Sequence, residues 1–367
     1  MIAEREIAGF VLPFTIGTLA ATVLSNQFFI SSSGLATASL FLVSASIFCL
    51  IHPHHSRWNE HILSLLLLIV SIGCGLFIGF SHDLLSISCD HNNSFTSEIA
   101  MRLCEPLRAS IEKLPFKNIT TNEIISALIT GERSGISPKT ISAFRESGAS
   151  HILALSGLHL GIIYGIISWI FSFLGRSPHS NRIRVFLIIA SCGLYTITTG
   201  ASPSITRAFL FILIGEISRL YNRHTSTAQV LMSAVFIQLL FSPSSAKEIG
   251  FQLSYAAMAG IAFIFPWLKN LWPEGKRGIM KWIWISATMS ISCQITTGPL
   301  VYFYFGTFPH HFLLTNLIAI PLTGVIIPLS LLTLVLSSIG ICPTFMMWIT
   351  ESLVNMMTEA MEIIASM

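Results

Sequence analysis

Polar side chains inside long apolar stretches are the residues of this sequence that could carry chemistry, and they are densest between residues 151 and 165. Ser156 and His159 are three residues apart, a spacing that places them near each other on one side of a helix. His151 stands shortly before them. A serine beside a histidine can act as a nucleophile with its base. Polar groups in hydrocarbon are functional candidates because burying them there is costly.

The surrounding residues argue against catalysis by this pair. Ala154-Leu155-Ser156-Gly157 is close to the Gly-x-Ser-Gly of intramembrane serine proteases. Those enzymes take their histidine from a different helix, and the first glycine of their motif is missing here. The histidines at 52, 54, 55 and 61 lie in a predicted loop without a nearby Asp, and no zinc-type cysteine spacing occurs. We therefore expect no catalytic residue, no metal and no cofactor.

Other apolar stretches also carry polar residues at helical spacing. These stripes are Ser191, Tyr195 and Thr198; Glu248, Gln252 and Tyr255; and Ser286, Ser290, Cys293, Gln294 and Thr297. Helices that each turn such a stripe inward enclose a hydrated cavity or pore. The alternative is that single Ser and Thr hydroxyls bond back to their own helix. It is weaker for Gln252, Gln294, Asn316 and Arg207, whose head groups need partners beyond the local turn.

The elements that position these residues are predicted to be membrane helices. Hydrophobic residues make up 53% of the 367 positions and charged residues 10%, with a mean hydropathy of +0.74. Apolar stretches long enough to cross a bilayer recur at roughly 8–28, 34–51, 62–80, 150–174, 184–200, 203–220, 227–242, 249–268, 280–305, 310–338 and 344–366. The fold class is therefore all-α, a polytopic integral membrane helical bundle with about 10–11 transmembrane helices. The last stretch carries Glu351, Glu359 and Glu362, so an interfacial helix is an equal alternative.

Charge placement predicts the topology. Lys and Arg concentrate in short loops on the side of the N-terminus, which we therefore expect to be cytoplasmic. The predicted parts are 1–80 with N-terminal transmembrane helices, an extracytoplasmic segment 81–149 with amphipathic helices, and a transmembrane channel domain 150–367. The helices of 81–149 either lie on the outer membrane face or form a solvated hairpin packed on the bundle.

Two features predict contacts between segments. Gly157, Gly161 and Gly165 recur every four residues, and small residues at this spacing let another helix approach closely. Cys89 and Cys104 are the pair of cysteines in the polar segment, which the topology places in an oxidising compartment. We expect them to form a disulfide.

A series of motifs resembles the ComEC-type competence proteins, which are inner-membrane channels for DNA uptake. The motifs are Gly131-Glu-Arg133, Phe144-Arg145-Glu-Ser-Gly148, His151 to His159, Tyr195, Thr199-Gly200-Ala-Ser-Pro-Ser204-Ile-Thr-Arg207-Ala208, Phe251-Gln252-Leu-Ser254-Tyr255, Gln294 with Pro299, and Asn316 to Pro321. They follow the family's order and cover roughly residues 120–330.

This resemblance implies a channel that passes single-stranded transforming DNA across the bacterial cytoplasmic membrane. The implied path residues are Arg145, His151, Ser156, His159, Tyr195, Arg207, Gln252, Tyr255, Gln294 and Asn316. The implied partners are single-stranded DNA, the lipid bilayer and other competence proteins, such as a DNA receptor, a cytoplasmic motor and a separate nuclease. The oligonucleotide-binding barrel and metallo-β-lactamase-like domain of many relatives are not visible, so we expect a short form without nuclease activity. The alternative function is a secondary transporter of a small polar solute.

Overall fold

The computed structural model describes residues 11–20, 68–78, 93–175, 177–221, 225–273, 278–306, 308, 310–341 and 344–367. All regular elements within these ranges are helices, which confirms the predicted all-α class. Packing divides the chain into two compact units. Unit 1 comprises Met1–Asn93 and His224–Ala262, and unit 2 comprises Ser94–Arg223 and Phe263–Met367. The two units are described separately.

Unit 1 contains two helices, Val11–Ala20 and Leu68–Ile78, that approach each other through glycines. A Cβ atom added at Gly17 would overlap the carbonyl of Ile72, and one added at Gly75 would overlap the carbonyl of Phe14. Only glycine permits two helix backbones to come this close. The unit also contains α11 (Thr227–Phe241), the 3-10 turn η2 (Pro243–Lys247) and α12 (Ile249–Ala259).

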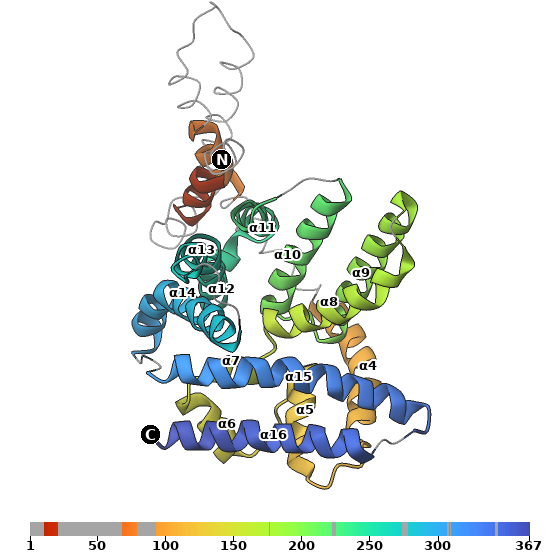
Figure 1. Cartoon of the computed structure of the whole chain (residues 1–367). Helices are drawn as coiled ribbons and strands as arrows, with labels where there is room; N and C mark the ends of the chain where they lie inside the picture. The colour runs from red at the N-terminus through yellow and green to blue at the C-terminus, as the bar shows by residue number, and fades with distance from the viewer. Residues whose placement is uncertain are drawn as a thin grey trace, which may run out of the picture. The chain divides into compact units, whose positions relative to one another are not determined.

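The centre of unit 2 is α5 (Ile119–Thr130), most of whose residues are buried. It packs against the long antiparallel helices α15 (Phe312–Ser338) and α16 (Thr344–Ala365), which lie side by side (Figure 1). The apolar residues of α5 belong to the same core cluster as Ile326 and Met357. The preceding helix α4 (Asn93–Glu112) is joined to α5 through Asn122, whose amide donates to the carbonyls of Ile111 and Leu114.

This packing bears on the predicted outer segment 81–149. The helices α5, α6 (Pro138–Glu146) and α7 (Ser150–Leu153) share contacts with α15 and α16 instead of standing apart from them. The polar side of α16 faces α5 and α6: Glu351 accepts the backbone N–H of Asn118 at 2.9 Å, and Glu362 pairs with Lys139 at 3.3 Å. Two of the three acidic residues that made α16 ambiguous in the sequence, Glu351 and Glu362, therefore join α16 to the start of α5 and to α6. Whether α16 spans the membrane or lies at its surface stays open.

A second core of unit 2 holds three consecutive helices together. They are α8 (Gly157–Phe171), α9 (Pro178–Thr198) and α10 (Pro203–Leu220). Leu160, Ile188, Cys192 and Ile205 meet in this core, each at most 1% exposed. Helix α9 starts with Ser177, whose hydroxyl accepts the Ser180 N–H, followed by proline at the first helical position.

The remaining helices of unit 2 are α13 (Phe265–Lys269) and α14 (Ile279–Phe305), which also packs on α15. Pro299 lies inside α14, and Pro321 and Pro328 lie inside α15. Each proline removes one backbone donor from its helix, a defect that membrane helices tolerate when neighbouring groups compensate.

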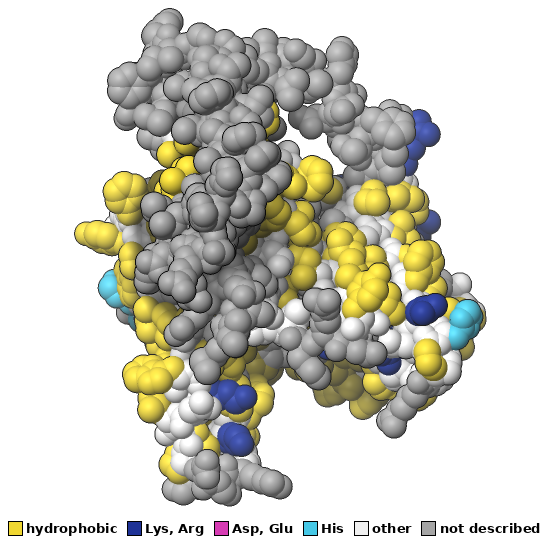
Figure 2. All heavy atoms as spheres, turned by 90° about the horizontal axis from the view of Figure 1, so that it is seen from above, with side chains coloured by type: hydrophobic (Ala, Val, Ile, Leu, Met, Phe, Trp, Pro, Cys, Tyr) yellow, Lys and Arg dark blue, Asp and Glu magenta, His cyan; other side chains and the backbone are white. Residues whose placement is uncertain are grey.

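Three helical stretches in the described residues are long and apolar enough to cross a membrane. They are Gly157–Leu174, Ile249–Lys269 and Phe312–Ser338. The face shown in Figure 2 carries broad areas of hydrophobic side chains, whereas Lys and Arg occupy only small areas of it. Exposed rings such as Trp169 and Phe186, both about two-thirds exposed, are typical of lipid contact. The chain is a membrane protein; the predicted stretch 34–51 lies outside the described residues, and the total number of spans stays a prediction.

Candidate functional site

Ser156 and His159 form the start of α8. Ser156 is the N-cap residue with extended backbone angles, φ −129° and ψ 171°, and His159 occupies the third helical position. The His159 Nδ1 atom accepts the backbone N–H of Ser156 at 3.2 Å and lies 2.9 Å from its Oγ atom. His159 thus does what Glu does in the usual capping box, satisfying a backbone donor that the helix leaves unpaired. It is fully buried.

This geometry gives the pair a capping role. Because Nδ1 accepts a backbone N–H, the neutral ring carries its proton on Nε2. Within the described part of the chain no carboxylate bonds to the ring, so the orienting third group of a hydrolytic triad is missing. The Ser156–His159 spacing that drew notice in the sequence is explained by helix initiation.

The segment before α8 is fixed by local contacts. The Nε atom of Arg133 donates to the Leu153 carbonyl at 3.0 Å, and a His151 ring nitrogen lies 3.2 Å from the Gly148 carbonyl. Glu132 accepts the Ser134 N–H at 3.0 Å, and these hydrogen bonds from Ser134 hold the pKa of its carboxyl below the usual range. The polar residues of this segment therefore hold the turn before α8 through hydrogen bonds to its backbone.

Two exposed cations lie on α6, with different surroundings. Lys139 pairs with Glu362. Arg145, in the last turn of α6, is exposed and forms no ion pair with a described residue. Of the predicted path residues, Arg145 is therefore the positive charge that this surface leaves available to a ligand.

Tyr195 and Arg207 are engaged inside the protein. The Tyr195 hydroxyl donates to the Ile129 carbonyl, near the end of α5, at 2.7 Å. Arg207 is 3% exposed in the first turns of α10. Its neighbour Ala208 faces the start of α8, where a Cβ atom added at Gly157 would lie 3.3 Å from the Ala208 Cβ atom.

The predicted glycine face of α8 finds a neighbour within unit 2 only at Gly157. A Cβ atom at Gly161 or Gly165 would meet no described atom within 4 Å, and both glycines are exposed. The reason is that α9 and α10 pack on the side of α8 that carries Leu160 and Tyr164. Close glycine contacts occur instead between the helices of unit 1 that contain Gly17 and Gly75.

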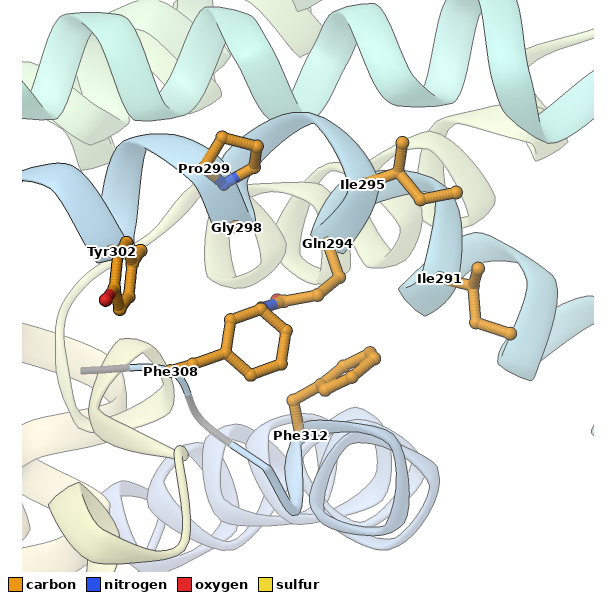
Figure 3. A pocket seen from close by; sticks show the side chains of 8 residues that line it. All are labelled: Ile291, Gln294, Ile295, Gly298, Pro299, Tyr302, Phe308 and Phe312. Carbon is orange, nitrogen blue, oxygen red and sulfur yellow. The ribbon is translucent and has the colours of Figure 1, made fainter. Parts of the chain in front are cut away.

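Gln294 lies in a pocket of about 510 Å³ on α14 (Figure 3). Its side chain points toward the rings of Phe308 and Phe312, and Tyr302 and Gly298 complete this part of the wall. The Gln294 Nε2 atom is buried and has no hydrogen-bond partner among the described residues. The Oδ1 atom of Asn316, on α15, is likewise buried without such a partner.

Gln252 and Tyr255 belong to unit 1. The amide of Gln252 donates to the Ala246 carbonyl at 3.0 Å, and the hydroxyl of Tyr255 donates to Oε1 of Gln238 at 2.8 Å. Their position relative to the residues of unit 2 is not defined, so a common path through all ten predicted residues stays a prediction. The predicted disulfide is also untested, because Cys89 lies outside the described residues.

One polar cluster was missed from the sequence. The Tyr164 hydroxyl of α8 donates to Oε1 of Glu216 on α10 at 2.5 Å. Nη1 of Arg219 donates to the same carboxylate oxygen at 2.8 Å and to the Tyr164 oxygen at 2.9 Å. An acidic residue within the apolar stretch 203–220 was the available signal, because an intramembrane charge requires a partner.

Comparison with known proteins places this arrangement in a family. A family model described as Competence protein matches residues 128–367. ComE operon protein 3 of Bacillus subtilis (strain 168) is 26% identical over 205 residues, which are 56% of this chain and 24% of that protein. Competence protein ComA of Neisseria gonorrhoeae is 26% identical over 216 residues, 57% of this chain and 30% of that protein.

Recombination protein 2 of Haemophilus influenzae is 26% identical over 233 residues, 59% of this chain and 28% of that protein. The matched part of the chain thus spans less than a third of the length of each of these relatives. No solved structure matches. Because the family model covers well over half of the sequence, from the end of α5 through α16, the chain belongs to the competence protein family.

Proposed function

We propose that this chain is a channel that passes single-stranded transforming DNA into the cytoplasm during natural competence. The observation that carries the proposal is the family match over residues 128–367. The matched region contains all three apolar stretches that are long enough to span a membrane, and it also contains α9 and α10. The names of two relatives, a competence protein and a recombination protein, fit a role in DNA uptake.

The proposal assigns passage and not catalysis to the chain. Ser156 and His159 are supported as capping residues, because the ring nitrogen that would serve as a base already accepts a backbone N–H. The proposal includes a separate nuclease, as a partner protein, that degrades the second DNA strand. A DNA receptor outside the membrane and a motor in the cytoplasm are further partners that strand import requires.

The proposed location is the bacterial cytoplasmic membrane with the N-terminus in the cytoplasm. Short loops rich in basic residues support this orientation, among them those near Arg182 and Lys281. With this orientation, α14 starts at the cytoplasmic side and ends toward the outer side. The pocket around Gln294 then faces the half of the membrane from which DNA arrives.

The direct test is DNA import by cells that lack the gene. We expect uptake of labelled DNA into the cytoplasm to fall to background in the deletion strain and to return on complementation, while DNA binding at the cell surface persists. The membrane potential is measured in parallel to exclude a general energetic defect. Unchanged import in the deletion strain would refute the proposal, and selective loss of a small solute's uptake would support a transporter instead.

A matched pair of variants on α6 tests the role of charge. Arg145→Gln removes an exposed cation that has no ion-pair partner among the described residues, and Lys139→Gln removes one that is paired with Glu362. Cations that contact a phosphate backbone give salt-dependent affinity, so we expect Arg145→Gln to lower import and Lys139→Gln to leave it near wild type. Equal import by the two variants would remove Arg145 from the path.

A further inference from the structure

The pocket on α14 is lined mainly by apolar and aromatic side chains. Three of these are aromatic, Tyr302, Phe308 and Phe312, and the amide of Gln294 points toward the rings of Phe308 and Phe312 (Figure 3). None of the described residues that line it carries a charge. Its volume of about 510 Å³ lies within the range of small-ligand sites.

The amide defines what the pocket can hold. The Gln294 Nε2 atom is buried and has no acceptor among the described residues. A buried donor without a partner is unfavourable, so an occupant that supplies an acceptor is favoured over one that does not. A saturated acyl chain supplies none.

The aromatic rings define the shape of the occupant. Phe308 and Phe312 lie with ring centroids 6.3 Å apart and planes at 82°, so one ring offers its face where the other offers its edge. Flat heteroaromatic groups stack on such faces. A Gln amide can at the same time bond to the edge of a base, which presents both acceptors and donors.

We infer that this pocket binds a nucleobase of the DNA strand, with Gln294 at the base edge and Phe312 or Phe308 at its face. The inference rests on the proposed function and deepens it by naming the part of the strand that is held. Because the pocket is uncharged, the phosphates stay outside it and the base alone enters. Stacking on aromatic faces tolerates every base, as a channel for DNA of any sequence requires.

Gly298 keeps the pocket open. A Cβ atom added there would lie 3.1 Å from a Phe308 ring atom and 3.4 Å from the Gln294 Nε2 atom. An alanine at this position would press on the ring and the amide together. The absence of a side chain at Gly298 is therefore what allows both groups to line the same space.

The test is photo-crosslinking of the purified full chain in lipid nanodiscs. The probe is a single-stranded oligonucleotide in which 5-iodouracil replaces thymine, and mass spectrometry locates the joined residue. We expect crosslinks at Tyr302, Phe308 or Phe312. Gln294→Leu and Phe312→Leu should each lower oligonucleotide affinity about tenfold, a loss within the range for a single stacked base. The matched control Phe345→Leu, at a ring 69% exposed on α16, should leave affinity unchanged.

Each other outcome overturns the inference. Crosslinks confined to other residues, with affinity retained by both pocket variants, would reject the base site and leave the channel proposal standing. Absence of any oligonucleotide binding by the wild-type chain would reject both proposals. Crosslinking of these rings to a photoactivatable acyl chain, undiminished by added oligonucleotide, would assign the pocket to lipid. Mapping on the wild-type chain decides among these results even where a variant fails to fold.

Discussion

We expect the cluster of Tyr164, Glu216 and Arg219 to stabilise the packing of α8 against α10. The variant Tyr164→Phe tests this, because it removes only the hydroxyl group. The Tyr164 hydroxyl both donates to the Glu216 carboxylate and accepts from Arg219. The Glu216 side chain is 2% exposed, whereas that of Arg219 is 63% exposed. When the hydroxyl is removed, the Glu216 carboxylate keeps its hydrogen bond from Arg219 within this cluster.

The magnitude follows from two limits. Hydrogen bonds to charged groups contribute about 1.5–3 kcal/mol in proteins generally, whereas interhelical hydrogen bonds in membranes average about 0.6 kcal/mol and reach about 1.7. The Tyr164 hydroxyl makes two such bonds to charged partners, so the loss should lie at the upper end of the membrane range. We expect about 1.5 kcal/mol, equivalent to about a tenfold change in the unfolding equilibrium constant.

The assay is reversible unfolding of the purified chain in mixed micelles of increasing denaturing detergent, followed by helix content. Tyr221→Phe is the matched control, because Tyr221 caps the end of α10 and is 70% exposed. Its effect should remain within about 0.5 kcal/mol. A double-mutant cycle with Glu216→Gln should show that the effects of Tyr164→Phe and Glu216→Gln are coupled.

The reasoning is refuted if Tyr164→Phe destabilises the chain no more than Tyr221→Phe does. Additive effects of Tyr164→Phe and Glu216→Gln would also refute it, since they would show that the 2.5 Å hydrogen bond contributes no interaction energy. A loss of stability confined to Glu216→Gln would instead assign the stabilisation to the ion pair with Arg219.

Two further predictions concern the packing around α5. Gly131→Ala should destabilise the chain by more than Gly200→Ala does. Both glycines have positive φ, so each substitution should cost about 1 kcal/mol of backbone strain, but an added Cβ atom overlaps Leu155 only at Gly131. Equal shifts in melting temperature for the two variants would contradict the overlap. Tyr195→Phe should lower the free energy of unfolding by about 1 kcal/mol, because it leaves the Ile129 carbonyl without its side-chain donor. Thermal unfolding measures this loss. Reduced DNA import at unchanged stability would instead support a role for this hydroxyl in the DNA path.

The all-α class, the position of many helices and the local helix starts could be predicted from the sequence. Apolar stretches of membrane length must be helical because a bilayer offers no other partner to the backbone. Ser156 and His159 lie together as their three-residue spacing predicted, although the structure does this through a capping box, with Ser156 as the extended N-cap residue and His159 at the third helical position. These features depend on neighbours in sequence, and the structure bears them out.

Only the tertiary structure decided which partners the polar side chains take. The sequence indicated that Arg207 needs a partner and placed Tyr195 on a polar stripe, but it did not indicate that Tyr195 bonds to α5 or that Arg207 is buried in α10. The pairing of Tyr164 with Glu216 and the burial of α5 were equally unreadable, because they depend on which helices pack together. A polar stripe on a helix looks the same in sequence whether water or another helix covers it, and that choice is made by segments far apart in the chain.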